Sequence, residues 1–416
     1  MNQSGNHSKG NDNPWAKLIA LCKKLLDALP GNVEPALLTF WTYRGGGKTT
    51  FLHSLSSALA APEVAVVGLW DVAAMELDRM IQEILHAVEA ASGVKKVVLL
   101  DNLDASLRLN DGQGFFELEH ELVLKLLERQ DVLLITTSQI PITTQWREYD
   151  VRIRQENHLI PPLSEQQITQ MEAATSSCAS QLFARSRGYP QVLAWLQQVP
   201  HLSEVELAQR VADYFLADLP DKTRELAFAA SLLPLFDIAV LRDLLATESD
   251  VEQEGFYADY VDRIRELIGI GLVAWDMNVG AYRFCNAVVR RLLAEGFQAL
   301  RPDDFKRIHQ IAAQYYQAES RRASYLHYTL VSAVYHMAQV QYIDDPSNVG
   351  NYCSRWVRDH LETWMGADWV AVLDAWRGAS GDEVVRKELH TLLGDETVDN
   401  ITQLLEGAKH AMEALR

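Results

Sequence analysis

The sequence has few cysteines, and they are widely separated. Cys22, Cys178, Cys285 and Cys353 form no CxxC pair, and the 12 histidines are scattered without metal-ligand spacing. This pattern argues against a disulfide framework or a zinc site. It favours four buried thiols in a reducing compartment.

Positive charge is also scarce. The chain carries 38 lysines and arginines against 56 acidic residues, a formal net charge of -18 at pH 7. Because contacts to phosphate groups need a basic surface, this balance disfavours a nucleic-acid partner. A local basic patch is still compatible with it.

The sequence lacks a long uninterrupted apolar run. Residues 1–13 are polar, without the apolar core of a signal peptide, and we predict a disordered tail there. The most apolar stretch, ELAFAASLLPLFDIAVL, is broken by Pro234 and Asp237 and is not a membrane span. We therefore predict a cytoplasmic protein.

With 416 residues, the chain is long enough for two to four domains. Residues 14–34 hold an amphipathic helix. Residues 35–160 then alternate apolar runs with helical periodicity, which predicts an α/β domain with a parallel sheet covered by helices on both faces. The predicted strands are 36–43, 63–70, 95–104, 131–138 and a last one within 150–160, with helices at 49–60, 73–91 and 115–130 between them.

After residue 160 the pattern becomes helical. Residues 161–214 and 301–416 read as helices throughout, and the second segment is solenoid-like but has no fixed repeat period. Residues 215–300 combine three helices with a hairpin whose turn holds Asn278 and Gly280. Three helices and a hairpin make a winged-helix layout.

A glycine-rich loop follows the first predicted strand. Gly45, Gly46 and Gly47 precede Lys48 and Thr49, between a strand and a helix. Such glycines let backbone N–H groups point at phosphates, the helix N-terminus adds a positive end, and the lysine reaches the outer phosphates. The sequence therefore predicts a phosphate-binding loop (P-loop) in which the Thr49 hydroxyl binds Mg²⁺.

A carboxylate at the end of another apolar strand supports this prediction. Asp101 ends VVLLD, where a magnesium-binding carboxylate of a P-loop protein is found. One strand–helix unit separates it from the loop, so we expect the two strands to be neighbours in the sheet. The absence of an [NT]-K-x-D motif favours adenine over guanine.

The order of motifs resembles the STAND class of P-loop ATPases, the signal-transduction group that includes NB-ARC and NACHT proteins. The similar segments are TYRGGGKTT, VVLLDNLD, LLITTS, PPLS and GYPQVLAWL, followed by the winged helix. The resemblance implies that 161–214 is a helical lid and that the chain binds ATP or ADP with Mg²⁺. It further implies a nucleotide site of Arg44, Gly45, Gly46, Gly47, Lys48, Thr49, Thr50, Ser138, Pro190 and Cys285, with Lys48, Asp101 and Asn102 as catalytic residues and Thr49 and Asp101 as metal ligands.

Several positions depart from the family pattern. Thr42 and Arg44 replace two loop glycines, and Ser138 replaces an arginine that senses the γ-phosphate. Asn102 stands where an acidic residue polarises the attacking water, and since an amide cannot act as a base, we expect slow hydrolysis or none. Cys285 replaces a histidine that contacts ADP in the resting state, and a thiol is a poor hydrogen-bond partner.

The predicted third helix of the winged helix bears on DNA binding. This is the element that enters the major groove in DNA-reading versions. Here it carries Asp259, Asp262 and Glu266 against Arg263 and Arg265, which is a slight acidic excess. We therefore expect this module not to read DNA.

The hypothesis that follows is a nucleotide-dependent switch. ATP or ADP would set the angle between domains, the C-terminal helices would sense a protein partner, and the ATP state would permit assembly with a separate effector or a nucleotide-dependent oligomer. A non-hydrolysing scaffold or regulatory subunit is one alternative. An AAA-like ATPase that loads or remodels DNA is another.

Overall fold

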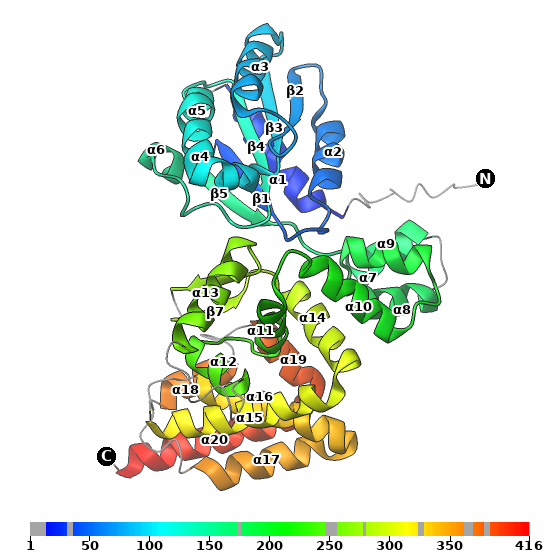
Figure 1. The fold of residues 1–416 in the computed structure, drawn as a ribbon, viewed down its shortest axis with the longest axis vertical. Helices are drawn as coiled ribbons and strands as arrows, with labels where there is room; N and C mark the ends of the chain where they lie inside the picture. Colours follow the sequence, from blue (N-terminus) through cyan, green and yellow to red (C-terminus); the bar gives the residue numbers. More distant parts are fainter. Residues whose placement is uncertain are drawn as a thin grey trace, which may run out of the picture. The chain divides into compact units, whose positions relative to one another are not determined.

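The computed structural model describes residues 14–30, 36–172, 176–245, 256–277, 280–322, 328–361, 369–377 and 383–415. The predicted tail, residues 1–13, lies outside them. The chain separates into two compact units, Met1–Leu202 and Ser203–Arg416 (Figure 1). Each unit is a body with its own core.

The first unit contains the predicted parallel sheet. Its strands are β1 (Leu37–Trp41), β2 (Val64–Asp71), β3 (Lys95–Asp101), β4 (Val132–Ser138) and β5 (Gln155–Leu159). All pairs are parallel, in the order β2-β3-β4-β1-β5. The central strands are continuous apolar runs because both of their faces are covered. The α/β prediction is confirmed.

Helices cover both faces of this sheet (Figure 1). Alternate side chains of one strand point to opposite faces, so Val97 and Leu99 join one core and Val98 and Leu100 the other. The first core is closed by α1 (Ala16–Asp27) and α2 (Lys48–Leu59). The second is closed by α3 (Leu77–Ala90), α4 (Gln113–Leu118) and α5 (Leu124–Leu127), with η1 (Leu103–Gly112, a 3-10 helix) and η2 (Glu119–Val123, a π turn) beside them.

Two details of the predicted sheet are wrong. β4 lies between β1 and β3, so the strands that carry the P-loop and Asp101 are not neighbours. Spacing along the chain fixes the order of connections but not the order of strands in the sheet. The segment predicted as a last strand also begins as a helix, α6 (Tyr149–Ile153), and only its second half pairs with β1 as β5.

A small helical subdomain completes the first unit. It consists of α7 (Glu165–Glu172), α8 (Ser176–Ser186) and α9 (Pro190–Gln198). Leu163, Ile168, Ala179 and Leu193 form its core. The unit ends at Leu202, whereas the predicted lid extends to residue 214; α10 (Glu204–Phe215) belongs to the second unit, where it packs on α14.

The second unit begins with the layout predicted for a winged helix. After α10 come α11 (Asp221–Ser231), α12 (Ile238–Leu245) and α13 (Phe256–Gly269), the antiparallel strands β6 (Val273–Asp276) and β7 (Ala281–Phe284), and α14 (Ala287–Leu300). Gly280 in the predicted turn has a φ of 69°, the left-handed region that glycine adopts without strain. The other predicted turn residue, Asn278, lies outside the described residues.

The rest of the second unit is helical, as predicted. Its elements are α15 (Pro302–Arg322), α16 (Tyr328–Asp344), η3 (Pro346–Asn348), α17 (Val349–His360), α18 (Trp369–Arg377), α19 (Glu383–Leu393) and α20 (Asp395–Leu415). α15 and α16 pack side by side (Figure 1). In the part of the chain that the structure describes, no helix has the length and apolar character to cross a membrane.

Candidate nucleotide site

The P-loop, residues 42–49, connects β1 to α2 in a tight turn. Gly45 and Gly47 have φ angles of 77° and 91°, in the left-handed region that favours glycine. Gly47 is the N-cap residue of α2. The first-turn N–H groups of α2 therefore open toward the loop, where they form an anion-binding end.

Thr42, at the first glycine position of the motif, has a packing role. It is buried, and its Oγ1 atom lies 2.3 Å from the position that a side-chain carbon on Gly46 would take. Its N–H donates to the Ser138 carbonyl at 3.2 Å. Thr42 therefore fills the loop against Gly46 and joins it to β4, so this departure from the motif is compatible with a closed P-loop.

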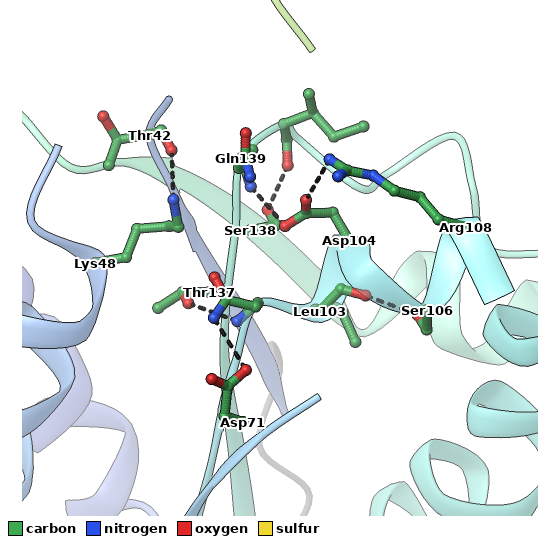
Figure 2. Close-up of polar contacts among 12 residues, drawn as sticks. Thr42, Lys48, Asp71, Leu103, Asp104, Ser106, Arg108, Thr137, Ser138 and Gln139 are labelled. Carbon is green, nitrogen blue, oxygen red and sulfur yellow. Dashed lines mark hydrogen bonds and ion pairs between the residues drawn. The ribbon is translucent and has the colours of Figure 1, made fainter. Parts of the chain in front are cut away.

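Lys48 lies inside the loop. Its side chain is buried, and Nζ donates to the Thr42 carbonyl at 3.2 Å (Figure 2). Burial lowers the pKa of Lys48, while the nearby carboxylates of Asp104 and Asp101 oppose this shift and Arg44 adds to it. Among the described residues Lys48 forms no ion pair. The ammonium group therefore retains donors for an incoming anion.

The two predicted metal ligands are in contact. Thr49 Oγ1, on the first turn of α2, donates to Asp101 Oδ2 at 2.6 Å. The Thr137 hydroxyl and the Asn102 N–H both donate to the other oxygen, Oδ1, which fixes the buried carboxylate. A hydroxyl and a carboxylate are the oxygen ligands that Mg²⁺ prefers. Thr49 is exposed, as is Thr50 beside it, while Asp101 is buried, and the Thr49 hydroxyl and the Asp101 carboxylate together fit a phosphate-bound Mg²⁺ ion.

Asn102 has a structural role at the edge of this site. Its φ of 55° is in the left-handed region, where asparagine is tolerated better than most residues. Its side-chain amide donates to Asp71 Oδ1, at the end of β2, at 3.0 Å. The same oxygen accepts from the Ala73 N–H at 2.9 Å. The amide is therefore held by the end of a neighbouring strand.

Ser138, predicted to face the γ-phosphate, ends β4 close to the P-loop. It is fully buried, and its hydroxyl donates to the Ile140 carbonyl. Its own carbonyl accepts from the Thr42 N–H. The hydroxyl and the carbonyl of Ser138 are thus both hydrogen-bonded to the backbone, and the second of these bonds links the end of β4 to the P-loop.

Asp104 is a site residue that the sequence reasoning missed. It is buried, accepts from the Gln139 N–H at 2.8 Å and pairs with Arg108 at 3.6 Å (Figure 2). It therefore joins η1 to the segment after β4 and places a carboxylate near Lys48. The available signal was the second aspartate of DNLD, three residues after Asp101.

The GYP segment of the helical subdomain contacts the P-loop. Pro190, the first residue of α9, has its Cγ 3.5 Å from the position that a side-chain carbon on Gly47 would take. The Gln191 N–H donates to the Gly45 carbonyl at 3.1 Å. The predicted Pro190 therefore lies at the loop, within the same unit.

Tyr189 is a second residue that sequence reasoning missed. Its buried hydroxyl lies 2.9 Å from the carbonyl oxygens of both Tyr43 and Arg44 and donates to them. The contact fastens the start of α9 to the P-loop. A tyrosine at the middle position of a Gly-x-Pro segment gave no recognisable signal in a single sequence.

Cys285 is the predicted site residue that belongs to the second unit. It lies between β7 and α14, and its N–H donates to the Leu272 carbonyl at 3.0 Å. Burial raises the pKa of its thiol to about 12, so the group is neutral at pH 7. Its predicted contact with the nucleotide stays a prediction.

Comparison with solved structures finds similar chains among proteins named ORC or Cdc6. The ORC2 protein of Aeropyrum pernix, solved in ADPNP-ADP complexes, is 12% identical over 72% of this chain and 97% of that chain, with a TM-score of 0.41. Cdc6p from Pyrobaculum aerophilum is 13% identical over 72% and 97%, with a TM-score of 0.31. The ORC1 protein of A. pernix, in complex with DNA, is 16% identical over 70% and 92%, with a TM-score of 0.32. No protein-family model and no curated protein matches the chain.

The prediction that disfavoured a nucleic-acid partner is contradicted by this comparison. The matched chains include proteins solved with DNA, A. pernix ORC1 and Drosophila ORC. Net charge is summed over both units, whereas contact with DNA depends only on the local surface. An acidic total is therefore no ground for excluding nucleic acid.

The matched proteins are named as ORC or Cdc6 proteins, and they do not show the predicted relationship to the STAND class. What the chain itself establishes is coarser. It has a parallel sheet, a glycine loop between β1 and the N-terminus of α2, and a carboxylate at the end of β3 beside that loop. The fold of the first unit is that of a P-loop NTPase.

Proposed function

We propose that this protein binds ATP or ADP with Mg²⁺ at the Lys48–Asp101 site and uses the bound nucleotide to control an assembly. The observation that carries the proposal is the 2.6 Å contact between Thr49 and Asp101 beside the loop that holds Lys48. The N–H groups of the loop and of α2 bind the phosphates, Lys48 neutralises the outer ones, and Thr49 and Asp101 hold the metal ion.

In this proposal hydrolysis is slow. Asn102 cannot accept a proton from water, and its amide is engaged by Asp71. Asn102→Asp tests this point by measuring phosphate release under saturating ATP. A raised rate is expected if the missing carboxylate limits turnover. An unchanged rate in a folded variant would remove Asn102 as the cause, and Asp104 would become the residue to test.

We place the protein first among AAA-like ATPases that act with DNA. The support is the comparison, in which matched proteins are solved with ADPNP and ADP and with DNA. A STAND-type switch is the second candidate, and the contact of Pro190 with Gly47 favours it, because the resemblance assigns the Gly-x-Pro segment to the nucleotide pocket. In both versions the C-terminal helices contact a protein partner, and the effector is a separate protein. The cytoplasmic location of the protein stays a prediction.

The binding site is tested by identifying the nucleotide released when purified protein is denatured. Wild-type protein should release ADP or ATP, and Lys48→Ala should release none. Lys125→Ala is the matched control. Lys125 is an exposed residue of α5 that pairs with Glu121 and takes no part in the P-loop. Nucleotide retained by the Lys48 variant would contradict the assignment.

The two versions are separated by a DNA titration. Duplex DNA is added across a salt series with ADP or with a non-hydrolysable ATP analogue bound. An AAA-like DNA-associated protein should bind DNA with an affinity that falls steeply with salt and changes with the nucleotide. Absence of DNA binding at low salt, together with nucleotide-dependent assembly on sizing, would select the switch.

A further inference from the structure

The second unit contains a polar groove between two of its C-terminal helices. α17 and α20 lie side by side (Figure 1). They border a cavity of about 570 Å³. This volume is within the range of small-molecule sites, about 300–1,000 Å³. Its polar lining includes Asn351, Ser354, Arg355 and Arg358 from α17, and Asn400 and Gln403 from α20.

Helical spacing explains why these side chains line one groove. Asn351, Arg355 and Arg358 follow each other at four and three residues, so they lie on one face of α17. The opposite face of α17 is buried in the core through Val349, Cys353, Trp356 and Val357. The polar stripe is therefore held in place by packing behind it.

The charge of the groove is unusual for this acidic protein. Its lining contains two arginines and no carboxylate. Within the described residues, no hydrogen bond or ion pair occupies the guanidinium of Arg355 or Arg358. By contrast, Arg265 and Arg307 elsewhere in the same unit each pair with an aspartate, at 2.9 and 3.2 Å. The guanidinium groups of Arg355 and Arg358 are therefore available to bind an anionic ligand.

We propose that this groove binds a small phosphate-bearing molecule. Two guanidiniums on one helix face match the oxygens of a phosphate, since each can donate two parallel hydrogen bonds. The amides of Asn351, Asn400 and Gln403 supply both donors and acceptors for hydroxyl or amide groups on the rest of the ligand. The site lies in the C-terminal helices of the second unit, whereas the P-loop belongs to the first.

The test uses isothermal titration calorimetry on the full chain carrying Lys48→Ala, so that the P-loop does not compete for the probe. Pyrophosphate is the probe, and it should bind at one site. The variant Arg355→Gln/Arg358→Gln should weaken this binding by about tenfold or more for each guanidinium removed. Arg265→Gln/Arg307→Gln removes the same charge elsewhere in the unit and should leave the affinity unchanged.

Four results would overturn the proposal. One is the absence of pyrophosphate binding, and the second is equal loss in the two double variants, which would mean diffuse attraction. The third is binding of citrate as tight as that of pyrophosphate, which would make the ligand a carboxylate. Arg355→Lys/Arg358→Lys keeps the charge but not the fork, and it should lose most of the affinity; full affinity in this variant would contradict phosphate recognition by the guanidiniums.

Discussion

Both units bury a cationic side chain, Lys48 in the first and Arg290 in the second, but only Arg290 has a carboxylate counter-ion among the described residues. In the first unit, Lys48 is 8% exposed and donates to a backbone carbonyl, with no ion pair among the described residues. In the second, Arg290 is 4% exposed, donates to the Ser231 carbonyl at 3.1 Å and forms a short ion pair with Glu388. Tyr335 completes the second arrangement by donating to the other Glu388 oxygen at 2.9 Å.

The pKa shifts of the two cations express the same difference. Burial lowers the pKa of Lys48, and the nearby carboxylates only partly offset it. Burial is also the largest single influence on the pKa of Arg290 and acts to lower it, but the charges and hydrogen bonds of Glu388 and Tyr335 together outweigh burial, so that pKa is raised. A buried cation paired with its counter-ion depends on that partner, because removing the partner leaves an uncompensated buried charge. A buried cation without a counter-ion is a candidate for binding a ligand.

The largest effect is expected from removing the counter-ion of Arg290. Glu388→Ala leaves the guanidinium buried and unpaired, which should lower the free energy of unfolding by about 3–5 kcal/mol. The measurement is urea denaturation of the full chain. Glu225→Ala is the matched control, because its pair with Arg301 is about half exposed and should contribute no more than about 1 kcal/mol. Similar losses in both variants would break the comparison.

A second effect should appear on acidification, through two histidines beside Arg290. His309 and His336 are buried and share a 2.7 Å contact between their Nδ1 atoms. Burial, with the charge of Arg290, lowers the pKa of His309 to about 3 and that of His336 well below 6.5. The unfolded chain therefore binds protons that the folded chain does not, so stability is full above about pH 6.5 and falls as pH decreases toward 3.

Between pH 6.5 and pH 5 this loss should be about 1–2 kcal/mol for His309, and His336 should add to it. Urea denaturation of wild type and of His336→Phe at both pH values measures it. Phenylalanine keeps the stacking of ring 336 on Tyr316 but cannot titrate, so the variant should lose less stability on acidification. Arg290 on α14 and Tyr335 on α16 lie around the pair, and neither changes charge in this range, because the pKa of each group is raised. An equal pH dependence in both proteins would contradict the assignment.

The sequence predicted the features that depend on local pattern. β1, β3 and β4 are apolar runs because they are buried on both faces, and the P-loop and Asp101 follow from motif and position. It did not predict that β4 separates β1 from β3, since strand order depends on packing between distant segments. The two most informative contacts are also distant in sequence: Tyr189 with Tyr43, 146 residues apart, and Arg290 with Glu388, 98 apart.

A smaller effect should come from Tyr189, whose hydroxyl holds two carbonyls of the P-loop. Tyr189→Phe keeps the ring but leaves the Tyr43 and Arg44 carbonyls without the hydroxyl donor, which should cost about 1–2 kcal/mol of stability. Because these carbonyls belong to the P-loop, nucleotide affinity should fall as well, by titration with a fluorescent ADP analogue. Tyr149→Phe, at a tyrosine that is 67% exposed, should change neither quantity. Lost stability with full affinity would mean that Tyr189 supports only the fold.

The smallest change in stability is expected where the cation has no counter-ion. Lys48→Met removes a desolvated charge and keeps a similar volume, so the free energy of unfolding should stay within about 1 kcal/mol of wild type or rise. The same variant should fail to bind nucleotide, since the ammonium group is the part that meets the phosphates. Denaturation and nucleotide titration of one preparation measure both. A loss of stability as large as that of Glu388→Ala would contradict this expectation. It would mean that the charge of Lys48, like that of Arg290, is needed for the stability of its unit and not only for binding phosphate.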